Sequence, residues 1–343
     1  MSKTVFVGMS GGVDSSLTAA LLKDQGYQVT GVYMKNWTQD LPGFICPWQQ
    51  DFLDAKRVAT QLGIAFKVYD FENQYRQKVV DYMVKEYQAG NTPNPDIMCN
   101  QEIKFKLFLE TALSEGADYI ATGHYAQIVD NKLYMGVDKT KDQSYFLYRL
   151  TQDALAKSLM PLGNMTKVKV RQIAKTLGLY TASKKDSQGI CFVGDIGIKD
   201  FLTSILGPQA DGDIIDETGK VIGRHDGAIF YTIGQRHGLN LGGGLPYYVT
   251  AKDIRNNLIY VTTDLNDPYL WSHEVKLSQL HWINGQPKTD KKFLARLRYR
   301  GPLIPAKLID DKLLLDEASR GLAIGQSAVI YNKDQVLGGG IIA

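Results

Sequence analysis

The N-terminal part of the chain alternates short apolar runs with longer amphipathic stretches. β-Branched and aromatic residues predict strands at 4–8, 28–33, 64–69 and 118–122. Leucine and alanine at helical spacing predict helices at 15–25, 51–62, 71–88 and 103–114. This alternation is typical of an α/β fold with a doubly wound parallel sheet, in which ligands bind beyond the carboxyl ends of the strands.

The pattern changes after about residue 200, where short β-rich runs replace the helices. They predict strands at 213–216, 221–223, 228–232, 247–250, 258–262, 292–298, 312–315, 327–331 and 336–342. Short strands at nearly regular spacing favour a small barrel or sandwich. We therefore expect an α/β domain at 1–199, a small β-rich central domain at 200–268 and a C-terminal β-barrel-like domain at 269–343.

Composition narrows the class of protein. The 343 residues are 44% hydrophobic and 22% charged, which is typical of a globular protein and not of a disordered chain. The 39 Lys and Arg against 36 Asp and Glu give a net charge of +3, so a surface for nucleic acid would need clustered cations. The apolar run at 5–9 is too short for a signal peptide, no run is long enough to span a bilayer, and three scattered cysteines build no disulfide framework. We expect a cytoplasmic protein without a membrane partner.

The strongest local signal is the sequence GMSGGVDSS at 8–16, between the first predicted strand and helix. Glycines allow backbone N–H groups to approach a ligand, serines add hydroxyl donors, and the helix N-terminus favours negative charge. The loop lacks both the Gly-Lys-Ser/Thr ending of a P-loop and the G-x-G-x-x-G spacing of a dinucleotide fold. We interpret it as a polyphosphate site, the alternative being a plain turn. Asp14 is either an oxygen ligand for Mg²⁺ or a helix cap.

Two cysteines lie in polar stretches that suit an accessible thiolate. Cys99 ends the sequence TPNPDIMC at 92–99, whose two prolines predict a stiff, non-helical loop before a helix that resumes after Asn100. Asp96 in this loop is a candidate general acid or base. Cys191 lies in KKDSQGICF. The alternative for any lone cysteine is a small buried apolar residue, and Cys46, among apolar neighbours, keeps that interpretation.

The segment 284–307 is rich in cations. It has one acidic residue, Asp290, and seven basic ones: Lys288, Lys291, Lys292, Arg296, Arg298, Arg300 and Lys307. The alternation of the three arginines predicts a stripe of guanidinium groups on one side of a strand, suited to nucleic-acid phosphates. The alternative is an ordinary solvated strand face.

SGGVDS resembles the pyrophosphate-binding loop of the N-type ATP pyrophosphatases, also called the PP-loop superfamily. The chain as a whole resembles the bacterial tRNA-specific 2-thiouridylase family, and the resemblance extends from residue 8 to residue 342. The matching stretches are GMSGGVDSS, NTPNPDIMCNQEIKF, ATGHYA, KDQSYFLYRL, KKDSQGICFVG, YTIGQRHGL and LGGGII. Only the sequence at 201–213 departs from the family pattern, which leaves the entry into the central domain open.

This resemblance implies a role for individual residues. The ATP-binding residues would be Gly8, Met9, Ser10, Gly11, Gly12, Val13, Asp14, Ser15, Met34 and Gly123. The target uracil would meet Asn94, Pro95 and Asp96, and tRNA would meet Lys141, Asp142, Gln143, Arg298 and Tyr299. Cys191 would carry a persulfide, Cys99 would act as nucleophile or resolving thiol, and the two would form a transient disulfide.

The implied reaction is ATP-dependent 2-thiolation of the wobble uridine of tRNA, with ATP and Mg²⁺ required and no permanently bound cofactor. Its partners would be the anticodon region of tRNA and a persulfide-donating cysteine desulfurase or sulfur relay protein. The two cysteines would then have to meet beside the glycine loop. Three alternatives remain: an ammonia- or amine-using ATP pyrophosphatase, an iron–sulfur sulfurtransferase using all three cysteines, and a non-catalytic RNA-binding module. His124 is expected to be structural or to contact the nucleotide.

Overall fold

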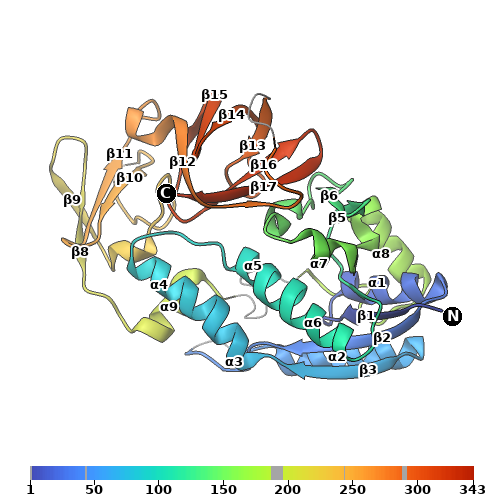
Figure 1. Ribbon diagram of the computed structural model, residues 1–343. Helices are drawn as coiled ribbons and strands as arrows, with labels where there is room; N and C mark the ends of the chain where they lie inside the picture. Colours follow the sequence, from blue (N-terminus) through green and yellow to red (C-terminus); the bar gives the residue numbers. More distant parts are fainter. Residues whose placement is uncertain (1, 43–44, 187–195, 243, 288–291) are drawn as a thin grey trace.

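A computed structural model describes residues 2–42, 45–186, 196–242, 244–287 and 292–343. The N-terminal domain is built on a five-stranded parallel sheet in the order β3-β2-β1-β4-β7 (Figure 1). Its strands are β1 (Thr4–Gly8), β2 (Gln28–Lys35), β3 (Ala65–Asp70), β4 (Tyr119–Ala121) and β7 (Ser158–Leu159). The predicted α/β fold with a parallel sheet is confirmed.

Helices lie between these strands and after β7. The longer ones are α1 (Val13–Asp24), α2 (Trp48–Leu62), α4 (Asp81–Gln88) and α8 (Lys167–Thr176). Shorter helical segments are α3 (Glu72–Tyr75), η1 (Arg76–Val80), η3 (Ser144–Leu147), α7 (Gln152–Ala156) and η4 (Pro161–Asn164). Gly63 ends α2 in a left-handed conformation with φ of 60°, as its position after the apolar pattern predicts.

One helix is longer than the sequence predicts. α5 (Pro95–Met98), the π-helical segment η2 (Cys99–Leu107) and α6 (Phe108–Ser114) follow one another without a break. The expectation of a non-helical loop through residue 100 is therefore wrong. Pro95 occupies the first helical position, where its fixed φ and missing N–H are tolerated.

The central domain is a small mixed sheet in the order β10-β11-β8-β9. It contains α9 (Ile198–Leu206), β8 (Gly212–Ile215), β9 (Val221–His225), β10 (Tyr248–Asp253) and β11 (Leu258–Thr262). The strand predicted at 228–232 is wrong, because the chain there forms the short 3₁₀ helix η5 (Ala228–Phe230). Side chains of β8, β10 and β11 pack with this turn into a separate small core.

The C-terminal domain is a barrel of six strands, closed by the pairing of β12 with β17. After η6 (Pro268–Leu270) come β12 (Trp271–Trp282), β13 (Phe293–Arg296), β14 (Ile304–Ile309), β15 (Lys312–Arg320), β16 (Ser327–Asn332) and β17 (Gln335–Ile342). The hairpin of β5 (Ala126–Val129) and β6 (Lys132–Met135) leaves the N-terminal domain and pairs with β17. The barrel sheet therefore includes two strands from another part of the chain (Figure 1).

In the part of the chain that the structure describes, none of the helices has the length and apolar character needed to cross a bilayer.

Candidate active site

The glycine loop between β1 and α1 is held by contacts within its own domain. The Ser15 hydroxyl accepts a hydrogen bond from the backbone N–H of Ser10 (3.1 Å) and lies 3.2 Å from the Gly12 carbonyl, to which it donates. Gly11 has a φ of 73°, and a Cβ there would lie 2.3 Å from the carbonyl oxygen of Asp51 on α2. A Cβ on Gly12 would meet only the Ser10 hydroxyl, at 3.5 Å. The tight turn therefore requires glycine at position 11.

The ends of β2 and β4, the strands on either side of β1, lie close to this loop. A Cβ on Gly8 would lie 3.0 Å from Cε of Met34, the last residue but one of β2. A Cβ on Gly123, just after β4, would lie 2.9 Å from the backbone carbonyl carbon of Asp14 and 3.0 Å from the backbone nitrogen of Ser15. Met34, Gly123 and the loop thus share the carboxyl edge of the parallel sheet, where ligands of such sheets bind.

An ionic network holds the carboxylate of Asp14. Nζ of Lys167, on α8, lies 2.8 Å from each Asp14 oxygen, and the Tyr125 hydroxyl donates to Oδ1 at 2.7 Å. The same Lys167 ammonium lies 2.8 Å from Asp186, which also pairs with Lys141 at 2.9 Å. Burial raises the pKa of Asp186, but hydrogen bonds from Lys167 and Lys141 outweigh it and lower that pKa to about 2. The network therefore links the glycine loop to the residues that follow α8.

Among the described residues, no group of three or more His, Cys, Asp or Glu is placed to hold a metal ion. Mg²⁺ is usually bound by one or two carboxylates together with substrate phosphates. Asp14 is the carboxylate beside the loop suited to phosphates, and it would bind Mg²⁺ only by exchanging a contact with Lys167 or Tyr125 for the ion.

The segment predicted to approach the base begins the long helix. The side-chain oxygen of Asn94 caps it by accepting from the backbone N–H groups of Asp96 (3.2 Å) and Ile97 (3.4 Å). Cys99 follows in the next turn, and its side chain is fully buried in the main hydrophobic core. The expectation that Cys99 lies accessible in a polar loop is wrong, because capping at Asn94 draws the segment into a packed helix.

The N-terminus of this helix nevertheless lies at the edge of the sheet that carries the glycine loop. This helix leads into β4, and in an α/β fold a helix that precedes a parallel strand begins on the side of the sheet where the strands end. Farther along it, the Phe105 ring packs 5.6 Å from that of His124, next to Gly123. The His124 Nδ1 lies 2.8 Å from the Thr122 hydroxyl, and burial holds the pKa of His124 well below its usual range. His124 is therefore a neutral, packed histidine.

Residues from the other two domains hold the chain just before this helix. The backbone N–H of Thr92 donates to the Ile324 carbonyl (2.7 Å), and the Gln326 amide donates to the Thr92 carbonyl (2.8 Å). The Thr92 hydroxyl also lies 3.2 Å from that of Thr232 in the central domain. We call these four residues, Thr92, Thr232, Ile324 and Gln326, the interdomain clamp.

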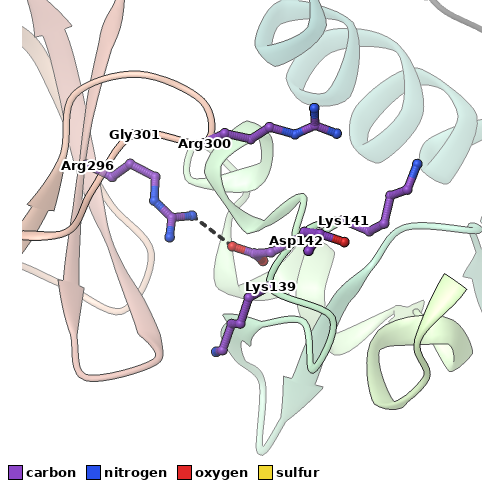
Figure 2. Close-up of a pocket in the computed structure, with 7 residues that line it drawn as sticks. Lys139, Lys141, Asp142, Arg296, Arg300 and Gly301 are labelled. Carbon is purple, nitrogen blue, oxygen red and sulfur yellow. Dashed lines mark hydrogen bonds and ion pairs between the residues drawn. The ribbon is translucent and has the colours of Figure 1, made fainter.

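Asp142, predicted to contact tRNA, is buried between the N-terminal domain and the barrel. Its carboxylate accepts from the backbone N–H groups of Gly136 (3.0 Å) and Ser144 (3.1 Å) and pairs with Arg296 at 2.9 Å (Figure 2). Only 2% of Asp142 is exposed, so its oxygens are committed to partners within the chain. The neighbouring Gln143 accepts from the Tyr125 N–H at 3.0 Å, and Lys141 belongs to the ionic network.

The predicted arginine stripe is wrong. β13 ends at Arg296, which is buried, whereas Arg298 and Arg300 are exposed on the turn that follows. This turn is closed by a hydrogen bond from the Gly301 N–H to the Arg298 carbonyl (2.9 Å), and Arg300 has a φ of 60°. The three arginines would lie on one side of a strand only if β13 continued through Arg300.

The same turn brings Tyr299 toward the predicted base site. Its ring lies 4.4 Å from that of Phe146, whose carbonyl accepts a hydrogen bond from the Asn100 amide (3.2 Å). Asn100 follows Cys99 directly, so a barrel residue and the start of the long helix lie close together. Cys191 falls outside the described residues, and its position relative to Cys99 stays a prediction.

Several residues of the site carry no sequence signal that we recognised. Lys167 joins the site through ion pairs with Asp14 and Asp186, and Asp186 also pairs with Lys141 and Arg171. The clamp residues Thr92 and Gln326 join it through hydrogen bonds between distant segments. Tyr125 lies inside the ATGHYA stretch, and Asp186 inside KKDSQGIC, so the two could have been marked as candidates from their motifs.

The parallel sheet with a glycine loop and helix N-terminus at its carboxyl edge defines a PP-loop ATP pyrophosphatase fold. A family model described as "tRNA methyl transferase HUP domain" matches residues 3–195. The models "tRNA methyl transferase PRC-barrel domain" and "Aminomethyltransferase beta-barrel domain" match residues 199–263 and 272–342. The order of domains in these models is that of the structure.

Curated relatives specify the family. The tRNA-specific 2-thiouridylase MnmA of Geobacillus thermodenitrificans is 48% identical, over 98% of this chain and 94% of its own length. The corresponding proteins of Geobacillus kaustophilus and Bacillus cereus are 47% and 45% identical, with the same shares of both chains covered. This chain belongs to the family of tRNA-specific 2-thiouridylases, a family of enzymes.

Proposed function

We propose that this protein uses ATP to replace the 2-oxygen of the wobble uridine of tRNA with sulfur. The observation that carries the proposal is the path of the chain on the carboxyl side of the parallel sheet: the glycine loop follows β1, and the helix that begins with Asn94, Asp96 and Cys99 leads into β4. A phosphate site and a thiol at one edge suit activation of an oxygen followed by attack of sulfur. Tyr299, from the barrel, supports placement of the RNA at the same edge.

In the first step, the loop at 8–15 binds the phosphates of ATP. Asp14 together with those phosphates would hold Mg²⁺, and the ion would neutralise part of their charge. The uracil O2 attacks the α-phosphorus, pyrophosphate leaves, and the base carries an adenylated oxygen. Asn94, Pro95 and Asp96 position the base, with Asp96 as general acid or base. An anticodon nucleotide is single-stranded and can be turned out into such a site.

In the second step, sulfur replaces the adenylated oxygen. A persulfide on Cys191, loaded by a cysteine desulfurase or a sulfur relay protein, supplies its outer sulfur to C2, and AMP leaves. The Cys99 thiolate attacks the inner sulfur, so the two thiols provide two electrons and end as a disulfide. An external thiol then reduces this disulfide. Because Cys99 is fully buried here, this step requires the packing around it to open when tRNA binds.

The decisive experiment supplies tRNA, ATP, Mg²⁺ and a cysteine desulfurase with L-cysteine as the persulfide source, and measures 2-thiouridine in the digested tRNA by mass spectrometry. Cys99→Ser should lower product formation at least 100-fold, while ATP binding is retained. Cys46→Ser is the matched control: Cys46 is also buried, burial raises the pKa of its thiol, and its Sγ lies 3.6 Å from the Trp37 carbonyl.

Full 2-thiouridine formation by Cys99→Ser would contradict the role of Cys99 in sulfur transfer. Pyrophosphate release without any 2-thiouridine, unchanged in Cys99→Ser, would favour an ammonia- or amine-using pyrophosphatase. Pyrophosphate release that needs no tRNA would contradict RNA as the substrate. Iron bound to the purified protein would favour the iron–sulfur alternative.

A further inference from the structure

Asn100 is a buried polar residue near the start of the long helix, and the reaction steps above do not use it. It follows Cys99 directly, and only 3% of it is exposed. Its amide nitrogen donates a hydrogen bond to the Phe146 carbonyl at 3.2 Å. Its side-chain oxygen, Oδ1, has no hydrogen-bond partner within the described residues. One half of this amide is therefore satisfied, whereas the other half lacks a donor.

The Phe146 carbonyl fixes the orientation of this amide. A carbonyl oxygen only accepts hydrogen bonds, so the nitrogen of Asn100 must face it and Oδ1 must point elsewhere. Phe146 is itself held, because its backbone N–H donates to the Gln143 carbonyl (3.0 Å) and its ring packs 4.4 Å from that of Tyr299. Asn100 thus presents a hydrogen-bond acceptor in a fixed direction and cannot turn to present a donor in its place.

A buried acceptor without a donor destabilises the folded chain, and this limits the kind of ligand that Asn100 can take. A group that supplies an N–H or O–H recovers the lost free energy when it binds. Nucleic-acid phosphates cannot supply it, because their oxygens are acceptors. The ligand group that matches Oδ1 of Asn100 is therefore a hydrogen-bond donor, which a base or a ribose hydroxyl carries and a phosphate does not.

The place of Asn100 on the helix indicates which donor it meets. Asp96, on α5, lies four positions earlier on the same continuous helix. Residues four apart lie on one side of a helix, with Cβ atoms about 5–6 Å apart. Asp96 is one of the residues proposed to position the base, and Cys99 is the proposed thiol. Asn100 is therefore on the side of the helix at which we place the base, one residue from the thiol.

The donor that distinguishes uracil from cytosine lies next to the reacting carbon. In a nucleotide, uracil has one ring N–H, at N3, and N3 is bonded to C2, where sulfur replaces oxygen. Cytosine has the same O2 and C2 but carries a lone pair at N3. A base that is turned out of its strand is read by hydrogen bonds to this edge. An acceptor held in a fixed direction pairs with uracil and repels the lone pair of cytosine.

We propose that Asn100 is a specificity-determining residue, whose Oδ1 accepts a hydrogen bond from N3–H of the target uracil and so selects uracil over cytosine. This inference rests on the proposed function and deepens it. Asn100 and Cys99 are adjacent and both buried, so the opening of the packing that exposes the thiol also exposes Oδ1. A uracil gains the hydrogen bond when it enters, whereas a cytosine leaves the acceptor without a donor. Selection of the base and exposure of the thiol are thus coupled.

The test compares two tRNA transcripts that differ only in the wobble base, uridine or cytidine. Single-turnover reactions with ATP, Mg²⁺ and a cysteine desulfurase with L-cysteine measure 2-thiouridine and 2-thiocytidine by mass spectrometry. The Kd of each transcript is measured in parallel, since it requires no product. Asn100→Leu removes the acceptor at similar size, so it should slow thiolation of uridine about 10- to 100-fold and lower the uridine-to-cytidine ratio by a similar factor.

Two further variants at the same position separate the oxygen from the packing. Asn100→Ala removes the oxygen without adding an apolar branch, and it should lower the ratio as Asn100→Leu does. Asn100→Asp keeps an oxygen at this position and should retain more of the ratio than either. Thermal unfolding of each variant shows whether the fold is preserved.

Asn36→Leu is the matched control, because Asn36 has the same chemistry in another place. It is 2% exposed, its amide nitrogen donates to the Met34 carbonyl (3.4 Å), and its Oδ1 is also without a partner in the part of the chain that the structure describes. Asn36 follows β2 and does not lie on the long helix. Asn36→Leu should therefore leave the uridine-to-cytidine ratio unchanged.

An unchanged ratio in Asn100→Leu and Asn100→Ala, with both rates lowered alike, would show that Asn100 only supports the helix and would overturn the proposal. A ratio that is kept in these variants but lost in Asn36→Leu or Asp96→Asn would assign the selection to that residue and overturn it as well. Absence of 2-thiouridine from reactions of the unaltered protein would instead overturn the proposed function.

Discussion

The glycine loop and the segment before the long helix lie at one edge of the sheet but are held in different ways. The loop is fixed inside its own domain, by Ser10, Ser15, Asp51 and the strand ends around it. The segment at 89–93 is fixed by the interdomain clamp, with partners from the central domain and the barrel. One half of the site therefore folds with the N-terminal domain, whereas the other half needs all three domains in place.

The largest effect is expected from a substitution that disrupts the glycine loop and leaves the interdomain clamp intact. Gly11→Ala forces a left-handed alanine, and its Cβ meets the Asp51 carbonyl at 2.3 Å. These two penalties should lower the free energy of unfolding by about 2–5 kcal/mol and abolish ATP binding. Thermal unfolding and nucleotide titration measure both.

Gly12→Ala is the control, because position 12 has ordinary space and a φ of −96°. Gly12→Ala should lower the free energy of unfolding much less than Gly11→Ala does. Equal losses in the two variants would contradict the specific role of the turn at position 11.

The second prediction concerns a substitution that weakens the interdomain clamp and leaves the glycine loop intact. Gln326→Ala leaves the Thr92 carbonyl without its side-chain donor, which should misplace the segment before Asn94. We expect thiolation to fall about tenfold, since loss of one such hydrogen bond is about 1.5 kcal/mol, while the Kd for ATP stays unchanged. Single-turnover thiolation and ATP titration provide the two readouts.

Gln172→Ala, at an exposed position on α8, should alter neither quantity. If Gln326→Ala weakened ATP binding as much as it slowed thiolation, the glycine loop and the segment before the long helix would depend on the same contacts. That result would contradict the comparison.

The smallest effect concerns the ionic network on the loop side. The pKa of Asp186 is lowered to about 2, so the ionised carboxylate stabilises the folded state above about pH 4. That contribution should disappear as the pH falls from about 4 to about 2, because the carboxylate is then protonated in the folded protein. The effect is modest, since the Asp186 side chain is 32% exposed and water screens it.

Urea unfolding of the unaltered protein and of Asp186→Asn at a series of pH values tests this. The difference in stability between the two should be present at pH 5 and shrink toward pH 2. A difference that stays constant over this window would show that Asp186 acts through packing.

The local parts of the fold could be predicted from sequence, and the interdomain parts could not. β1 and the glycine loop follow from adjacent residues, because a strand, a turn and a helix begin within one short stretch. The start of the long helix was missed because the two prolines suggested a loop, whereas Asn94 caps a helix with Pro95 at its first position. The clamp and the Arg296–Asp142 pair join residues far apart in sequence, which no local pattern reveals.

The hairpin of β5 and β6 was also missed, although it carried a signal. Asp130 and Asn131 both have positive φ, as a tight two-residue hairpin turn requires, and both residue types tolerate it. The composition of the flanking residues gave no indication that this hairpin joins the barrel through β17.

That pairing makes β17, near the end of the barrel sequence, the strand that joins the barrel to the β5–β6 hairpin of the N-terminal domain. Removing the barrel would leave the backbone groups of β6 that now pair with β17 without their partners, and unpaired strand edges promote aggregation. We therefore expect the N-terminal domain to aggregate when it is produced alone. Deleting β17 should also destabilise the β5–β6 hairpin, which follows Gly123 beside the nucleotide loop.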